Sequence, residues 1–329
     1  MSNSSLEPTQ KSSDPCVEIK ALLLAHGVHI RKLIGSGAYA KVRLAWNDRE
    51  DQLIAVKEID RSSNSEFVRK FLPREIDIVR RLEHKNIIKV FDIIEMGAYI
   101  CFLEEFGSRG DLLSLIKKEK RLEEEKGKFI FRQMVDALQY LEQMRVVHRD
   151  LKCENIVFDD CDNIKISDFG FSRYMLPGEK SRTFCGSRAY AAPEILRSQP
   201  YSGFGVDIWS AGVILYVMLV GLMPYDETKP RKMLEKQMRH RLSFPSRVNL
   251  TFEAKILIFD MLHPQPDKRK QCKDIIQTNW LKDTPYRVLS SKTTHSREDS
   301  FSPTTYSENA RAGNSVAKKP DITAARLQT

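Results

Sequence analysis

The sequence predicts an α+β fold in which a small lobe of antiparallel strands precedes a larger helical lobe. Three observations lead to this prediction. In the first third of the chain, short runs alternate apolar and polar residues, as half-buried strands do. From Asp111 onward, apolar residues recur at helical spacing. The chain has 329 residues, 41% of them hydrophobic, which is enough for one large domain with a core.

Five alternating runs are the predicted strands of a mostly antiparallel sheet, at residues 28–34, 42–46, 53–59, 88–94 and 99–103. One helix interrupts them. Pro73 suits a first helical turn, and four residues after it share one face by their spacing: Glu75, Ile78, Val79 and Leu82.

The helical lobe contains three clear apolar patterns. The first is carried by Phe129, Phe131, Met134, Leu138 and Leu141, and the third covers residues 254–262. Between them, the run 208–223 is the most apolar stretch of the chain. It is interrupted by Ser210 and is shorter than the roughly 18–20 residues that a membrane-spanning helix needs. We therefore expect a buried core helix and no membrane span.

The two ends differ in composition from the middle. Residues 1–27 begin with a polar stretch and are predicted to be a flexible extension, with a short helix over 17–24. Residues 28–281 form one predicted domain, with lobes at 28–106 and 107–281. Residues 282–329 are rich in Ser, Thr, Asn and Lys, which predicts a disordered tail without a fold of its own.

The formal charge of +9 does not indicate a nucleic-acid partner, because Lys and Arg are scattered among many acidic residues. The six cysteines include no C-x-x-C pair, which argues against a zinc ribbon or a disulfide framework. No secretory signal is visible, and Ser2 stands where N-myristoylation needs glycine. A reducing, intracellular and cytoplasmic location is the expectation.

The segment 34–42 joins two predicted strands and holds two nearby glycines. Glycine permits a tight hairpin whose backbone amides approach phosphate oxygens, while an ordinary hairpin remains the alternative. A dinucleotide-binding turn is disfavoured because a strand follows rather than a helix. The predicted nucleotide contacts here are Ile34, Gly35, Ser36, Gly37, Ala38 and Val42.

Lys57 lies inside an apolar strand, two residues after Ala55, which is assigned to the same nucleotide site. An inward-facing lysine needs a partner, and Glu75 on the apolar face of the following helix supplies one. Alone, either residue would more often be exposed. Together they predict that Lys57 holds nucleotide phosphates and that Glu75 holds Lys57.

The loop 148–155 carries two side chains suited to phosphoryl transfer. Asp150 could orient a substrate hydroxyl and accept its proton, and Asn155 could ligate magnesium. A strand at 164–166 leads to Asp168, a candidate second oxygen ligand, although Asp-x-Gly is also common at turns. The predicted cofactors are ATP and Mg²⁺.

The domain contains these residues in a fixed order: Gly35, Gly37, Lys57, Glu75, His148–Arg149–Asp150, Asn155, Asp168–Phe169–Gly170, Ala192–Pro193–Glu194, Asp207 and Arg269. This set resembles the eukaryotic protein kinase family across residues 28–281. The resemblance implies the bilobal protein kinase fold, with structural roles for Glu194, Asp207 and Arg269. Lys152 is the serine/threonine-kinase version of its position, where its charge would offset the transferred phosphoryl group.

Further segments are similar to the testis-specific serine/threonine kinases, in the calcium/calmodulin-dependent and AMP-activated kinase group: 36–42, 70–76, 183–187, 189–194 and 223–226. This resemblance implies a role in spermatogenesis or sperm function and in differentiation. It also implies chaperones as partners, and the nucleus or sperm structures as further locations.

Control and substrate choice are predicted at four residues. Thr183 lies between Asp168 and Glu194, and its phosphate could pair with Arg149 and order the segment. An upstream kinase or autophosphorylation would supply that phosphate. Asp111 and Glu154 match sites where kinases that prefer basic substrates hold arginine, which carboxylates bind bidentately.

Few positions depart from the family pattern, and Glu104 is the one that bears on activity. Glu104 falls at the back of the implied ATP pocket, before the hinge residue Glu105, and a buried carboxylate there is costly unless paired or protonated. This departure is compatible with an alternative function, that of a pseudokinase scaffold. The evidence against that alternative is the presence of Lys57, Asp150, Asn155 and Asp168. A third hypothesis is a basic module that binds nucleic acid or membrane through the tail, and it is supported by charge alone.

Overall fold

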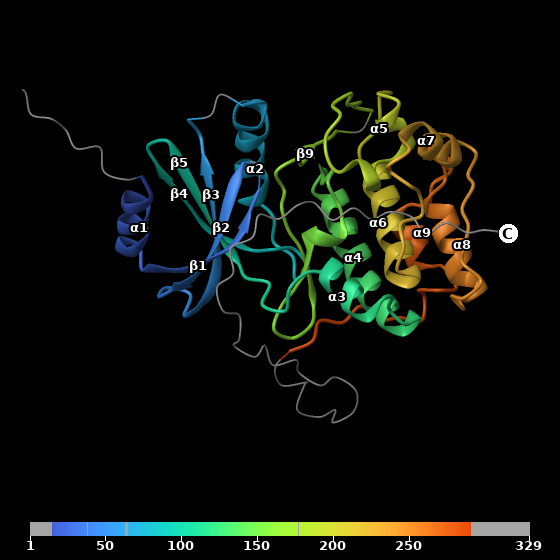
Figure 1. The fold of residues 1–329 in the computed structure, drawn as a ribbon, viewed down its shortest axis with the longest axis horizontal. Helices are drawn as coiled ribbons and strands as arrows, with labels where there is room; N and C mark the ends of the chain where they lie inside the picture. The colour runs from blue at the N-terminus through green and yellow to red at the C-terminus, as the bar shows by residue number, and fades with distance from the viewer. Residues whose placement is uncertain (1–14, 38, 63–64, 177, 291–329) are drawn as a thin grey trace, which may run out of the picture.

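The small lobe is built on a five-stranded antiparallel sheet in the order β1-β2-β3-β5-β4 (Figure 1). The structure, a computed structural model, describes residues 15–37, 39–62, 65–176 and 178–290. The strands are β1 (Val28–Ser36), β2 (Ala40–Asn47), β3 (Gln52–Asp60), β4 (Val90–Met96) and β5 (Tyr99–Glu105).

All five predicted strands are present, and β4 is displaced toward the C-terminus. The displacement has a structural cause, because the residues before β4 contact the other lobe. Ile88 donates its N–H to the carbonyl of Ile166 at 2.9 Å, and Ile87 forms a parallel bridge with Ile166.

The two faces of the sheet contact different partners because side chains alternate along each strand. On the outer face, Val56 and Leu103 pack with Ile19 and Leu23 of α1 (Pro15–Ala25), which is the helix expected over 17–24. Figure 1 shows α1 on the side of the sheet away from the helical lobe. The inner face presents Lys57 and its neighbours toward the helical lobe.

The helix of the small lobe begins with a π-helical turn, η1 (Phe67–Phe71), and continues as α2 (Leu72–Val79). Pro73 lies in the first turn of α2, as expected. Glu75, Ile78 and Val79 are buried. Leu82 falls beyond the end of the helix but still packs against the core.

The large lobe is mainly helical, as expected. Its elements are α3 (Leu112–Glu119), α4 (Glu124–Gln143), β6 (Val146–Val147), η2 (Cys153–Asn155), β7 (Ile156–Phe158), β8 (Ile164–Ile166), β9 (Arg173–Tyr174), η3 (Arg188–Tyr190), α5 (Pro193–Leu196), α6 (Phe204–Val220), α7 (Pro230–Met238), α8 (Phe252–Met261), η4 (Pro266–Lys268) and α9 (Cys272–Ile276).

The most apolar run of the sequence forms α6, which is buried from Val206 to Val220 and lies at the centre of the lobe. The predicted core helix is therefore confirmed. Within the described ranges, no helix combines the length and the apolarity that crossing a bilayer requires.

The chain remains packed after Leu281. Segment 284–290 returns along α4, where Arg287 and Leu289 accept side-chain hydrogen bonds. The expectation of a disordered tail therefore needs correction for these residues. Their contacts run mainly through backbone groups, which composition does not reveal. The remainder of both predicted extensions, 1–14 and 291–329, lies outside the described residues.

Candidate active site

The glycine-containing segment forms a hairpin between β1 and β2. Strand pairing continues to Ser36 opposite Lys41, and the N–H of Gly37 donates to the carbonyl of Ala40 at 2.8 Å. Ala38 lies outside the described residues. A strand follows the loop, as the phosphate-loop hypothesis requires.

The tip of this hairpin contacts the start of the helix that carries Glu75. The rings of Tyr39 and Phe67 are stacked with centroids 4.7 Å apart. Phe67 in turn lies 6.4 Å from Phe71 and 6.3 Å from Phe171, which follows the Asp168 turn. No sequence pattern predicted a role for these aromatic residues. They join the glycine loop, η1 and the segment after Asp168.

Lys57 lies between two carboxylates. Its Nζ donates to Glu75 Oε1 at 2.7 Å and to Asp168 Oδ1 at 2.9 Å. Lys57 is 8% exposed and Glu75 is 1% exposed, so both charges are removed from water and need each other. The pairing expected from the sequence is present, and Asp168 joins it from the other lobe.

The electrostatics of this cluster favour the charged pair of Lys57 and Asp168. Burial alone would lower the pKa of Lys57, but Asp168, Glu75 and Glu104 raise it well above its usual value. The Lys57 ammonium lowers the pKa of Asp168 to about 2. Burial raises the pKa of Glu75 despite its contact with Lys57. Asp168 is therefore ionised at neutral pH, as a metal ligand must be.

Glu104 lies on the inner face of the sheet, since it pairs with Ala55 on β3 while Lys57 pairs with Phe102. Cross-strand partners share a face, so Glu104 points to the same side as Lys57. Burial raises the pKa of Glu104 to about 7, although Lys57 opposes the shift. Glu104 thus shares the inner face of the sheet with Lys57, and its position at the back of an ATP pocket stays a prediction.

We expect Glu104→Gln to stabilise the domain at pH 8 and to have little effect at pH 5. The folded-state pKa of about 7 exceeds the ordinary 4.5, so the folded protein binds the proton more tightly and loses stability as pH rises between these values. The loss is on the order of 3 kcal/mol once the carboxyl group is ionised.

Urea unfolding of the nucleotide-free protein at the two pH values measures this effect. Glu95→Gln, at an exposed position of β4, is the control. Equal changes in unfolding free energy at both pH values for Glu104→Gln would contradict the raised pKa.

The side chain of Glu105 makes its contacts outside this cluster. Its carboxylate accepts from Lys165 Nζ at 2.6 Å through Oε1, and its N–H donates to the carbonyl of Lys89 at 2.8 Å. The side chain thus joins the end of β5 to β8. Any contact of Glu105 with a nucleotide would come from the backbone.

The loop 148–155 is held by a carboxylate of the central helix. Asp207, at the start of α6, accepts the N–H of His148 at 2.7 Å and that of Arg149 at 2.9 Å. These bonds hold Arg149 in the left-handed region, with φ of 67°. The structural role expected for Asp207 has this geometric basis.

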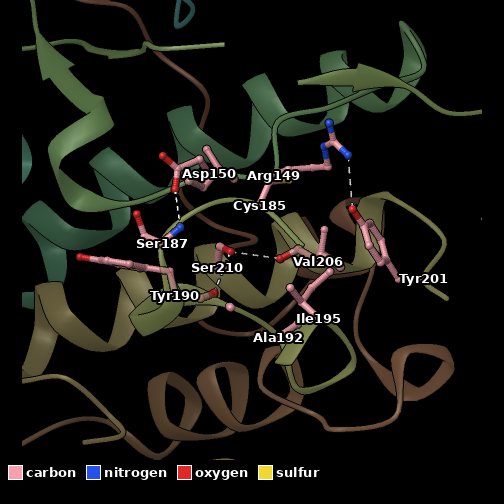
Figure 2. A pocket seen from close by; sticks show the side chains of 12 residues that line it. Arg149, Asp150, Cys185, Ser187, Tyr190, Ala192, Ile195, Tyr201, Val206 and Ser210 are labelled. Carbon is pink, nitrogen blue, oxygen red and sulfur yellow. Dashed lines mark hydrogen bonds between the residues drawn. The ribbon is translucent and has the colours of Figure 1, made fainter. Parts of the chain in front are cut away.

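Asp150 is buried and receives hydrogen bonds on both carboxylate oxygens. Lys152 Nζ donates to Oδ2 at 2.7 Å, and the backbone N–H of Ser187 donates to Oδ1 at 2.7 Å. Lys152 also reaches Ser187 Oγ at 3.4 Å. Figure 2 shows Asp150 and Ser187 facing each other at a small pocket that Cys185 and Tyr190 also line.

The contact with Ser187 depends on Gly186, for which no motif predicted a role. Gly186 has φ of 85°, and a Cβ there would lie 2.3 Å from the carbonyl oxygen of Arg149. Only glycine lets the two segments approach this closely. The signal was present as a glycine before Ser187, but nothing in the pattern showed which backbone it would meet.

Two side chains carry oxygens of the kind that bind magnesium. Asn155 Nδ2 donates to the carbonyl of Asp150 at 3.0 Å, which orients the amide. Within the described chain its Oδ1 accepts no hydrogen bond, so this oxygen is available to a cation. Asp168 supplies an ionised carboxylate, and oxygen ligands of this kind suit Mg²⁺.

Arg149 and Thr183 are linked through Tyr201. The Tyr201 hydroxyl donates to the carbonyl of Thr183 at 3.0 Å, and Arg149 Nη1 donates to that hydroxyl at 3.4 Å, as Figure 2 shows for the second contact. Arg149 Nε donates to the carbonyl of Phe171 at 2.7 Å. Its Nη2 is buried without a hydrogen-bond partner among the described residues. That unpaired cationic donor is suited to an anion near Thr183.

Glu194 and Arg269 form a buried two-pronged ion pair. Arg269 Nη1 donates to Oε1 at 2.8 Å and Nη2 donates to Oε2 at 3.1 Å. The guanidinium also reaches the carbonyls of Gly205 and His263, at 2.6 Å and 3.1 Å. The pair thus joins α5, the start of α6 and the turn before α9.

The two residues expected to bind substrate arginine lie on the surface of the large lobe. Asp111 caps α3 by accepting from the N–H and hydroxyl of Ser114, at 2.8 Å and 2.9 Å. Glu154 is exposed on η2. Both carboxylates act on the pKa of the Cys153 thiol, which burial raises to about 12. Asp111 and Glu154 therefore both lie near Cys153 of the catalytic loop.

The chain belongs to the protein kinase family, because the family described as "Protein kinase domain" matches residues 28–281. The resemblance found from the motifs is confirmed, together with the bilobal fold of a strand-rich small lobe and a helical large lobe. The chain is accordingly an enzyme of the protein serine/threonine kinase class.

Its relatives include testis-specific serine/threonine kinases. The chain is 44% identical to testis-specific serine/threonine-protein kinase 2 of Mus musculus over 278 residues, which cover 82% of this chain and 78% of the relative. It is 40% identical to testis-specific serine/threonine-protein kinase 3 of Homo sapiens over 266 residues, covering 80% and 98%. It is 36% identical to testis-specific serine/threonine-protein kinase 4 of Homo sapiens, covering 79% and 84%.

Proposed function

We propose that the chain transfers the γ-phosphoryl group of ATP to serine and threonine hydroxyls of protein substrates, with magnesium as cofactor. The observation that supports this most directly is the contact of Lys57 with both Glu75 and Asp168. It brings a phosphate-binding cation from the small lobe together with a metal-binding carboxylate from the large lobe, beside Asp150 and Asn155.

Binding of ATP would use residues of both lobes. The backbone of the hairpin at Gly35 and Gly37 approaches the phosphates, and Lys57 neutralises them while Glu75 holds its ammonium in place. Asn155 Oδ1 and the Asp168 carboxylate would hold Mg²⁺. When bound, the metal neutralises charge on the phosphate oxygens.

Asp150 would receive the proton of the substrate hydroxyl as its oxygen attacks phosphorus and the bond to the ADP oxygen breaks. The hydrogen bonds from Ser187 and Lys152 hold the Asp150 carboxylate in one orientation. Lys152 also places positive charge beside the transferred group.

The decisive experiment is incubation with labelled ATP, Mg²⁺ and a peptide containing arginine and serine. Label that is transferred by the parent but not by Asp150→Asn supports the proposal. Equal label with both proteins would mean that the activity is not this chain's. Binding of ATP without any transfer would favour the pseudokinase scaffold instead.

We expect a preference for substrates with arginine two or three residues before the acceptor. Asp111 and Glu154 offer carboxylates near Cys153 of the catalytic loop, and an exposed pair of charges contributes up to about 1 kcal/mol, or roughly fivefold in kcat/KM for each arginine. Peptides with that arginine replaced by alanine measure the effect. The double variant Asp111→Asn, Glu154→Gln should lose the preference; equal kcat/KM across the series for the parent would contradict it.

We expect phosphorylation of Thr183 to activate the enzyme. A phosphate there would meet the unpaired Nη2 of Arg149 and order the segment that donates Ser187 to Asp150. Thr183→Ala should lower the rate of the phosphorylated preparation about tenfold or more, as a population shift of roughly 1.4 kcal/mol implies. Thr228→Ala is the control, because Thr228 is distant in the chain from Thr183. Full activity of Thr183→Ala would contradict activation by this route.

The names of the relatives support a role in the testis. We propose that the protein acts in sperm formation or function, in the reducing cytoplasm or nucleus of male germ cells, after phosphorylation by an upstream kinase or by itself. Detection of the protein by antibody across tissues tests this, and its absence from germ cells would oppose it.

A further inference from the structure

Three buried amide side chains form a continuous hydrogen-bonded row next to β8. Asn86 Nδ2 donates to Gln133 Oε1 at 3.0 Å, and Gln133 Nε2 donates to Asn163 Oδ1 at 3.1 Å. Asn86 and Gln133 are 0% exposed and Asn163 is 1% exposed. They come from the loop between α2 and β4, from the middle of α4, and from the turn between β7 and β8. We call this set the amide row.

The amide row binds the backbone of segment 284–290. Gln133 Nε2 donates to the carbonyl of Arg287 at 2.7 Å. Asn163 makes a two-way contact with Leu289, whose N–H donates to Oδ1 at 2.7 Å and whose carbonyl accepts from Nδ2 at 3.0 Å. An amide side chain that donates to and accepts from one residue mimics a neighbouring β-strand.

One side chain of the segment reaches the same row. The hydroxyl of Tyr286 donates to Asn86 Oδ1 at 2.9 Å, and its ring lies 6.4 Å from that of His84. Every residue of the amide row therefore contacts the segment directly.

Without segment 284–290, the amide row would contain a buried polar group that lacks a hydrogen-bond partner. Gln133 Nε2 has two hydrogens, of which one serves Asn163 and the other serves Arg287. Removing the segment would leave a buried N–H without a partner, which is costly in the interior. The polarity and burial of the row thus fit an extended peptide backbone rather than a packed apolar surface.

The row lies between the elements that carry Glu75 and Asp168. The carbonyl of Asn86 accepts from the N–H of Ile166 at 2.8 Å, and the carbonyl of Ile166 accepts from Ile88 at 2.9 Å. Ile166 ends the strand that leads to Asp168, and Asn86 follows the helix that carries Glu75. A displacement of the amide row is therefore expected to displace Glu75 and Asp168, the two carboxylates that hold Lys57.

We propose that the amide row is a binding site for an extended peptide backbone, that residues 284–290 are its occupant, and that the occupied site positions Glu75 and Asp168. The site lies outside the ATP- and substrate-binding residues. Asn86, Gln133, Asn163 and Tyr286 act as positioning residues. Only the last part of the proposal rests on the proposed function, since peptide binding can be measured without phosphoryl transfer.

The test compares two proline variants of the full-length protein. Leu289→Pro removes the N–H that donates to Asn163. Val288→Pro is the matched control, since the N–H of Val288 makes no hydrogen bond within the described chain. Amide hydrogen exchange is followed in the nucleotide-free protein. Leu289→Pro should speed exchange about tenfold at Ile88 and Ile166 and leave α8 unchanged, whereas Val288→Pro should resemble the parent.

A synthetic peptide of residues 284–290, added in excess, should restore slow exchange to Leu289→Pro. Tyr286→Phe, which loses one hydrogen bond and no packing, should give a smaller increase of about two- to threefold at the same amides. Parent-like exchange in Leu289→Pro would overturn the proposal. So would equal increases in both proline variants, or faster exchange throughout the domain, which would indicate general destabilisation.

Kinetics separate this inference from the proposed function. If the chain transfers phosphate, Leu289→Pro should lower kcat about three- to tenfold and leave KM for the peptide substrate unchanged, since the row does not touch the substrate. An unchanged kcat with altered exchange would overturn the positioning part alone. Absence of transfer by the parent would refute the proposed function while the exchange results still decide peptide binding.

Discussion

Asp150→Asn should lower the rate of phosphoryl transfer by about 10²–10⁴-fold, the usual contribution of a positioned general base. The amide has nearly the shape of the carboxylate but cannot take the proton of the substrate hydroxyl. It also replaces one acceptor by a donor, which would face either the N–H of Ser187 or the ammonium of Lys152. After the substitution, the hydrogen bonds from Ser187 and from Lys152 to this side chain cannot both form.

Initial rates with labelled ATP measure the change, and affinity for ATP should be nearly unaffected because Lys57, Glu75 and Asp168 remain. Asp92→Asn, on the exposed side of β4, makes the same chemical change away from the site and should keep the parent's rate. A rate for Asp150→Asn above a tenth of the parent's would show that Asp150 is not the base.

Arg269→Met should destabilise the domain by about 3–5 kcal/mol, because it leaves Glu194 buried without its cationic partner. Glu194 is 6% exposed, so water cannot replace the two lost hydrogen bonds. The carbonyls of Gly205 and His263 lose their donor as well. We expect a lower midpoint of urea unfolding with an unchanged dependence on urea concentration.

The adjacent residue supplies the control. Lys270 pairs with Asp260 at 3.2 Å on the surface, and removal of such a pair costs at most about 1 kcal/mol. Lys270→Met should therefore unfold close to the parent. A similar small change for Arg269→Met would mean that the buried pair contributes little. Adding Glu194→Gln to Arg269→Met should recover part of the loss, since no uncompensated charge then remains.

Sequence patterns predicted the parts of the site that depend on side-chain type. Lys57 and Glu75 could be paired because a buried charge needs an opposite charge, and the two predicted elements that carry them adjoin in the chain. Asp207 and Arg269 entered only through the family's motif, and their partners could not be predicted. These partners are backbone N–H groups, backbone carbonyls and Glu194, which depend on the three-dimensional path of the chain.

Contacts made by the backbone could not be predicted from the sequence. Ser187 donates through its N–H to Asp150, and Leu289 is recognised by Asn163 through groups that every non-proline residue possesses. Residue type carries no signal for such contacts. For the same reason, composition did not predict the order of residues 284–290, because polar residues can be fixed by their backbone as firmly as apolar ones by packing.

The sheet of the small lobe separates two hydrophobic clusters. The larger one contains inward residues such as Ile59 and Phe102 and extends to Leu281 in the helical lobe. The smaller one joins α1 to the outward residues of the same strands, among them Val56 and Leu103. Loss of the smaller cluster need not expose the larger one. We expect α1 to open as an independent cooperative unit at a lower free energy than the domain. Thermal unfolding of this chain would then begin at its N-terminal helix and would not be a single two-state transition.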